Sequence, residues 1–71
     1  MKLTPRQLEI VQMLVTGMKD KEIRTELGLR NKKSISRHVM RACRRLGLET
    51  REQLIAQSVA LGFVNVPIMA P

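Results

Sequence analysis

The 71-residue chain is poor in aromatic side chains, with one Phe and neither Tyr nor Trp. Sequence-specific RNA-binding domains stack unpaired bases on exposed aromatic rings, so this composition argues against an RNA-binding function. The chain also contains one cysteine, Cys43, and one histidine, His38. These are too few for an internal disulfide bond or for a zinc site. We therefore expect no metal or other cofactor, and a small core held by aliphatic packing or by self-association.

Residue patterns that carry out catalysis are missing as well. The sequence has no paired carboxylates, no metal-ligand cluster and no glycine-rich phosphate loop. A nucleophilic Cys43 would need solvent exposure and a basic partner. Its place beside an apolar helical stripe is instead typical of a small buried hydrophobe. We therefore predict that the chain is not an enzyme.

Long apolar runs are also absent. No window reaches the roughly 18 consecutive apolar residues of a membrane-spanning helix, and no apolar signal-peptide segment follows the first residues. We expect a soluble, cytoplasmic protein that has no membrane partner.

Acidic residues are absent from residues 30–47, and this stretch holds the whole charge excess of the chain. The formal net charge is +7, and the stretch contributes +7 by itself. Its basic residues are Arg30, Lys32, Lys33, Arg37, Arg41, Arg44 and Arg45. A charge that served solubility alone would be scattered, whereas a single basic stripe is typical of a protein that binds a polyanion.

The same stretch has the period of an amphipathic helix, at about 100° per residue. Its narrow apolar stripe consists of Ile35, Val39, Ala42 and Leu46. The opposite arc carries Ser36, Arg37, Met40, Arg41 and Arg44. The borders between the two faces hold His38, Arg45 and Cys43. A solvated surface helix would explain this pattern alone, but the concentration of charge favours a binding face.

Capping and stop residues divide the chain into four expected helices. Thr4 and Gln7 form a capping-box pattern at the first helix, which Gly17 ends. A second helix is expected from near Asp20 to Gly28, with acidic residues at its positive N-terminal end.

The second half of the chain repeats this punctuation. Asn31 is the expected N-cap of the third helix, about 33–46. Thr50 and Gln53 form another capping box at the fourth helix, which Gly62 ends. No segment alternates polar and apolar residues, so we expect no sheet.

We therefore predict an all-α fold, a small four-helix domain with a central helix-turn-helix. This domain covers residues 1–62, and a short, extended, apolar C-terminal tail covers residues 63–71.

Short motifs along this framework resemble the LuxR/GerE-type DNA-binding domain of bacterial regulators. The matching residues are Leu3-Thr4-Pro5-Arg6, Glu9, Gly17, Lys21-Glu22-Ile23, Leu27-Gly28-Leu29, Lys33-Ser34-Ile35, His38, Arg44-Arg45-Leu46-Gly47, Arg51 and Leu54. Their order and spacing carry the resemblance over residues 3 to about 61. The receiver or ligand-binding domain usual in the family is absent, so we expect a stand-alone member or a fragment.

The resemblance implies a transcriptional regulator whose third helix enters the major groove of double-stranded DNA. The residues it places toward base edges are Ser36, Arg37, Met40, Arg41 and Arg44. The resemblance places Lys21 and His38 toward phosphates. Lys32, Lys33 and Ser34 open the third helix, where backbone N–H groups and the helix dipole favour phosphate, and Arg45 is expected to face phosphates as well. For His38, a local hydrogen bond at the border of the helix is an equal alternative.

The chain departs from the family pattern in three ways. The turn between the second and third helices is one residue longer than usual. Arg24 stands where the family has a small residue packed under the third helix, so its stem must turn outward or the helices must separate. Ser36 replaces a common lysine, which removes one long donor from the groove face.

The resemblance also implies a homodimer through the fourth helix, on an inverted-repeat DNA site. The expected interface residues are Leu54, Ser58, Leu61, Phe63 and Val64. The apolar tail adds its own reason, because it is too apolar to leave in water. It would bury against the fourth helix across a dimer, or fold back over its own domain. The alternative function is an interaction module or anti-activator that pairs with a larger transcriptional regulator.

Overall fold

The computed structural model describes residues 3–66. Their helices are α1 (Pro5–Val15), α2 (Asp20–Leu27), α3 (Ser34–Leu46) and α4 (Arg51–Ala60). Residues 3–66 contain no strand, and the all-α prediction is confirmed. None of these helices is long and apolar enough to cross a membrane.

Two helices begin at the capping boxes predicted from the sequence. The Thr4 side chain accepts a hydrogen bond from Gln7 N at 3.1 Å, and Gln7 Oε1 accepts one from Thr4 N at 2.9 Å. Thr50 and Gln53 exchange the equivalent bonds at the start of α4, at 3.1 and 3.2 Å. Each pair satisfies backbone donors that a helix end leaves without intrahelical partners.

The start of α3 differs from the prediction. Lys33, not Asn31, occupies the N-cap position, and it makes no side-chain capping bond. The Asn31 side chain instead accepts from Lys33 N at 2.8 Å, and the Asn31 carbonyl accepts from Ser34 Oγ at 2.8 Å. Asn31 therefore closes its own turn two residues ahead of the cap, a common alternative use of Asn.

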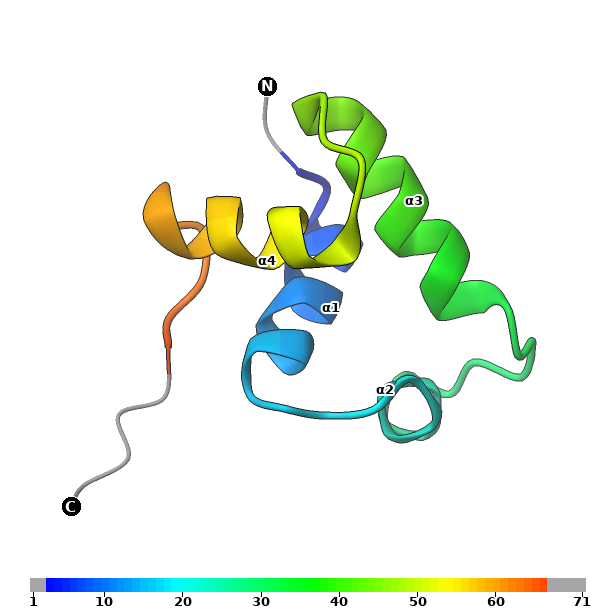
Figure 1. The fold of residues 1–71 in the computed structure, drawn as a ribbon. Coiled ribbons are helices and arrows are strands. Elements are labelled where there is room, and N and C mark those ends of the chain that lie inside the picture. The colour runs from blue at the N-terminus through cyan, green and yellow to red at the C-terminus, as the bar shows by residue number, and fades with distance from the viewer. Residues whose placement is uncertain (1–2, 67–71) are drawn as a thin grey trace, which may run out of the picture.

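All four helices contribute to the core, and α2 supplies the fully buried Ile23. α1 packs on α3 and α4, α3 packs on α4, and α2 packs on α3, so the longest helix touches every other one (Figure 1). The apolar stripe of α3 faces inward: Ile35, Val39 and Ala42 are buried and Leu46 is partly buried. Burial of this stripe leaves the opposite arc of α3 on the surface.

Glycine ends both helices of the helix-turn-helix. Gly28 and Gly47 each have a φ of 68°, in the left-handed region that other residues rarely adopt. The predicted stops of α2 and α3 are therefore confirmed.

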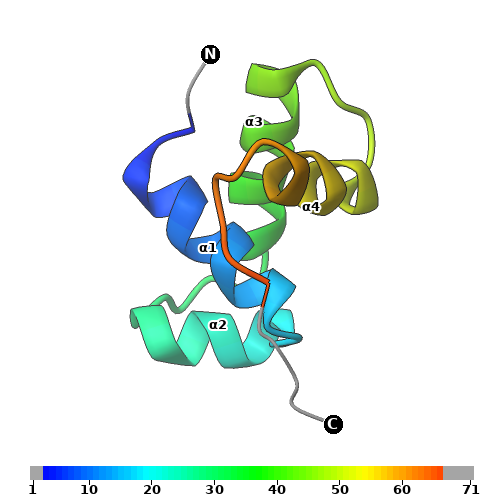
Figure 2. The ribbon, with the colours of Figure 1, turned by 90° about the vertical axis from the view of Figure 1, so that its left-hand side faces the viewer.

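The segment after α4 folds back over the domain. It runs from the end of α4 along α1, and Val64 is buried in the core (Figure 2). The Gln12 side chain donates to the Asn65 carbonyl at 2.8 Å and accepts from Asn65 N at 2.9 Å. Of the two arrangements expected for the tail, residues 63–66 adopt the folded-back one. The remaining tail, residues 67–71, lies outside the described residues.

Candidate nucleic-acid interface

The outer face of α3 presents the five residues assigned to base edges. Ser36, Arg37, Met40, Arg41 and Arg44 are all exposed. Met40 is 52% exposed and is the apolar member of this group. The structure therefore brings the predicted base-edge residues together on one surface.

Residues assigned to phosphates flank this face. Lys32 and Lys33 are exposed in the turn and at the N-cap of α3. Ser34 is half-buried, and its hydroxyl already donates to the Asn31 carbonyl. The N-terminal end of α3 carries the positive end of the helix dipole, which favours a nearby phosphate.

His38 lies at the border between the outer face and the core. It is half-buried, and burial lowers its pKa below the ordinary value of 6.5. The cationic side chains of Arg41 and Arg6 lower the pKa further, because they disfavour a second positive charge. His38 therefore sits in a positive surrounding that would accept an anion.

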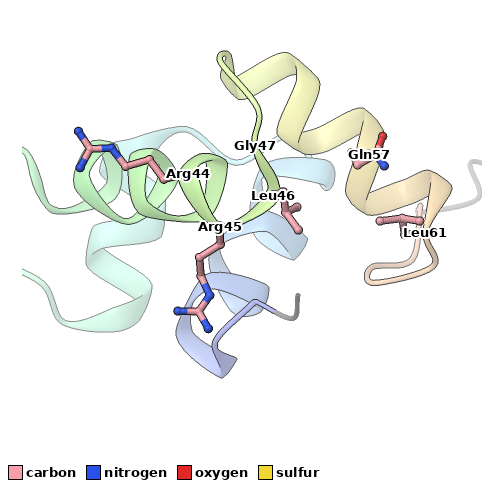
Figure 3. A pocket seen from close by; sticks show the side chains of 6 residues that line it. All are labelled: Arg44, Arg45, Leu46, Gly47, Gln57 and Leu61. Atoms are coloured by element: carbon pink, nitrogen blue, oxygen red, sulfur yellow. The ribbon is translucent and has the colours of Figure 1, made fainter.

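The basic end of α3 adjoins α4. Arg44 and Arg45 leave the helix in different directions, and both line a hollow of about 500 Å³ (Figure 3). The remaining lining residues are Leu46, Gly47, Gln57 and Leu61.

A second hollow, of about 310 Å³, lies beside the outer face of α3. Three of the base-edge residues line it, namely Ser36, Met40 and Arg44. Glu49 and Arg51, from the start of α4 and the loop before it, line it as well. The sequence assigned no site role to these two residues, because only tertiary packing brings the loop beside α3.

Arg51 connects this region to α2. Its guanidinium donates from both terminal nitrogens to the Asp20 carboxylate, at 2.6 and 3.1 Å. The hydrogen bond with Asp20 raises the pKa of Arg51 above its ordinary value. Asp20 directly precedes Lys21, the exposed residue assigned to a phosphate. The ion pair therefore joins the first residue of α2 to the first residue of α4.

Cys43 forms part of the core beneath this surface. Its side chain is buried, and its Sγ lies 3.5 Å from the Thr50 carbonyl. Burial raises the pKa of the thiol, while the charge of Arg51 opposes that shift. The prediction of a small buried hydrophobe is confirmed.

The side chain of Arg24 on α2 is partly withdrawn from solvent. The residue is half-buried, and its Nε is buried without a hydrogen-bond partner. The helices still pack on each other. The domain therefore keeps the α2–α3 contact with an arginine at the position where the family has a small residue.

The residues expected at a dimer interface do not share one surface. Leu54 and Ser58 are fully buried and Val64 is 6% exposed, because they fill the core of the single chain. Their assignment to the interface is wrong for this reason. Phe63 is half-buried, and Leu61 is 52% exposed. Leu61 is the member of the set that most clearly offers surface to a partner.

The sequence of this domain matches a known protein family. The model of bacterial regulatory proteins of the luxR family, GerE, matches residues 1–60. The chain belongs to the luxR family. Spore germination protein GerE of Bacillus subtilis (strain 168) is 32% identical over 64 residues, covering 90% of this chain and 85% of that protein. The resemblance seen in the sequence is confirmed.

A solved structure of the transcription factor GerE has the same fold. It superposes with a TM-score of 0.83 at 31% identity, over 92% of this chain and 96% of that chain. As a luxR-family member, the chain is a DNA-binding transcriptional regulator. This membership favours DNA binding over the alternative of a module that only pairs with a larger regulator.

Proposed function

We propose that this luxR-family regulator binds double-stranded DNA by inserting α3 into the major groove. The observation that carries the proposal is the outer face of α3, which is exposed, basic and without an acidic residue. An α-helix fits the width of the major groove, where each base pair presents a distinct pattern of donors and acceptors.

Side-chain chemistry divides the proposed contacts into two groups. Arg37, Arg41 and Arg44 can each donate two hydrogen bonds to guanine O6 and N7. Met40 can pack on a thymine methyl group. The hydroxyl of Ser36 can hydrogen-bond to a donor or an acceptor on a base edge. The proposed phosphate contacts are Lys21, Lys32, Lys33, Ser34, His38 and Arg45. Phosphate contacts fix the register of a protein on DNA, while base contacts select the sequence.

The proposed assembly is a homodimer on an inverted-repeat site in the cytoplasm. One such domain offers an interface of only about 600–1,000 Å² with DNA, which is small for a specific site. The exposed side chain of Leu61 supports an interface near the end of α4. A two-fold dimer would place the two α3 helices about one duplex turn apart.

Substitutions on the two groups test this division. Arg37→Ala and Met40→Ala should each weaken binding to the specific site more than to random DNA. The expected loss is about 1–3 kcal/mol where a bidentate contact of Arg37 is removed. Lys33→Ala is the matched control, because loss of a phosphate contact should weaken both duplexes alike. Equal losses on both duplexes for all three variants, measured by fluorescence anisotropy, would reject the assignment of base contacts.

A further inference from the structure

The weakest-anchored helix of the domain is α2. It has eight residues, and Ile23 is its buried member. It packs on α3, and Leu27 near its C-terminal end is partly buried against the core. With few apolar side chains to hold it, α2 also depends on polar contacts for its orientation.

A two-point contact fixes the N-terminal end of this helix. Both terminal nitrogens of Arg51 donate to the Asp20 carboxylate, at 2.6 and 3.1 Å. A planar guanidinium that meets a carboxylate in this way restricts direction as well as distance. The two residues are 31 positions apart, so the pair crosses the fold from α4 to α2.

The pair lies at the edge of the proposed DNA-binding surface. Asp20 is next to Lys21 in the first turn of α2, and Arg51 lines the hollow that Ser36, Met40 and Arg44 also line. Their side chains are 35% and 33% exposed, so solvent screens the pair and its contribution to stability is small. Its geometry bears more directly on where Lys21 lies relative to α3.

We propose that Asp20 and Arg51 are positioning residues for DNA binding. Their ion pair holds the N-terminal end of α2, and with it Lys21, in register with the groove-facing surface of α3. This inference rests on the proposed function, because it concerns the same DNA-bound state. Neither residue needs to touch a base for the pair to act.

Charge and positioning predict opposite effects of Asp20→Asn on DNA affinity, so this substitution distinguishes them. Asp20→Asn removes a negative charge beside a polyanion, so simple electrostatics would strengthen DNA binding. Loss of positioning should instead weaken it, by about fivefold, the factor that corresponds to a coupling of about 1 kcal/mol. Glu26→Gln is the matched control, because it removes an exposed carboxylate from the same helix. It should leave affinity unchanged or raise it.

A charge exchange tests the pair independently of any single variant. Arg51→Asp should weaken binding, and the double variant Asp20→Arg with Arg51→Asp restores the net charge of the chain. Positioning predicts that the double variant recovers much of the affinity that Arg51→Asp loses. The double variant Glu26→Arg with Arg51→Asp restores the same net charge without the pair, and it should recover less. The affinities for the specific duplex are measured by fluorescence anisotropy. The temperature is kept below the unfolding transition of each variant, which circular dichroism determines.

The outcomes separate this inference from the proposed function. Failure of the unaltered protein to bind duplex DNA overturns both. Normal binding by the unaltered protein, together with equal or tighter binding by Asp20→Asn, overturns the positioning role alone. A double variant that binds no better than Arg51→Asp, while folded, also overturns it. Weakened Asp20→Asn, unchanged Glu26→Gln and a recovered double variant support it.

Discussion

His38 shows how a single side chain in this domain takes its properties from its surroundings. Burial and the charges of Arg41 and Arg6 lower its pKa in the free protein. The ring is therefore largely neutral at pH 7, and His38 is the single histidine of the chain. A phosphate placed beside the ring would favour the protonated form and raise the pKa in the complex.

This difference predicts a pH-dependent affinity for DNA. If the pKa of His38 is higher in the complex than in the free protein, binding takes up a proton, and affinity rises as the pH falls through the value in the complex. Titrations of DNA binding between pH 8 and pH 6 check this. His38→Gln should flatten the profile. Identical pH profiles for the variant and the unaltered protein would place His38 away from the phosphates and favour a local hydrogen bond instead.

At the scale of the elements, local sequence determines the helices and long-range packing determines how they meet. Capping pairs and glycine stops involve residues within four or five positions of one another in the sequence. Both ends of α2 and the starts of α1 and α4 were therefore predictable. The groove face of α3 was equally predictable, because helical periodicity fixes which residues oppose the core stripe.

The features that the sequence did not predict depend on contacts between distant residues or on local competition. Asn31 had two uses open to it, a helix cap and a turn of its own, and the structure has the turn. The burial of Val64 accompanies the folded-back segment and its bonds to Gln12. The Asp20–Arg51 pair likewise has no local signature.

Arg24 of α2 gives a prediction about stability. The Nε of Arg24 is a buried donor without a partner, and such a group destabilises a fold by about 1–3 kcal/mol. Arg24→Lys puts a methylene group in place of Nε and keeps the charge, so it should raise the free energy of unfolding by about 1 kcal/mol. For a domain of this size, the thermal midpoint should rise by about 4–8 °C.

Arg24→Ala separates this effect from packing, because it also removes the stem. A lower midpoint for Arg24→Ala than for Arg24→Lys is expected. A midpoint that moves in neither variant would show that the Arg24 side chain is solvated and that the α2–α3 contact does not depend on it.

The whole molecule combines a small aliphatic core with one basic face, and the segment after α4 closes the core. Val64 contributes a buried side chain and Asn65 a pair of hydrogen bonds to Gln12. Burial of a valine side chain stabilises a fold by about 1.5–3 kcal/mol. The tail therefore has a role in stability that is separate from any role in assembly.

Truncation distinguishes these two roles. A chain that ends after Gly62 should unfold at a lower temperature, whereas a chain that ends after Val66 keeps the contacts of Val64 and Asn65 and serves as the control. Sedimentation of both chains then reports on assembly. Dimers that persist in the shorter chain would assign the interface to α4. Monomers at high concentration in both chains and in the full protein would contradict dimerisation in free solution.

DNA binding by this domain depends on the basic face of α3 meeting the duplex. The most direct test is the salt dependence of duplex binding by the unaltered protein and by Arg37→Ala and Arg44→Ala. The logarithm of the binding constant should fall linearly with the logarithm of salt concentration, with a slope of about −0.9 for each neutralised phosphate. Each variant should bind more weakly at every salt concentration. Binding that is indifferent to salt and to both substitutions would contradict the use of α3 as the DNA-binding helix.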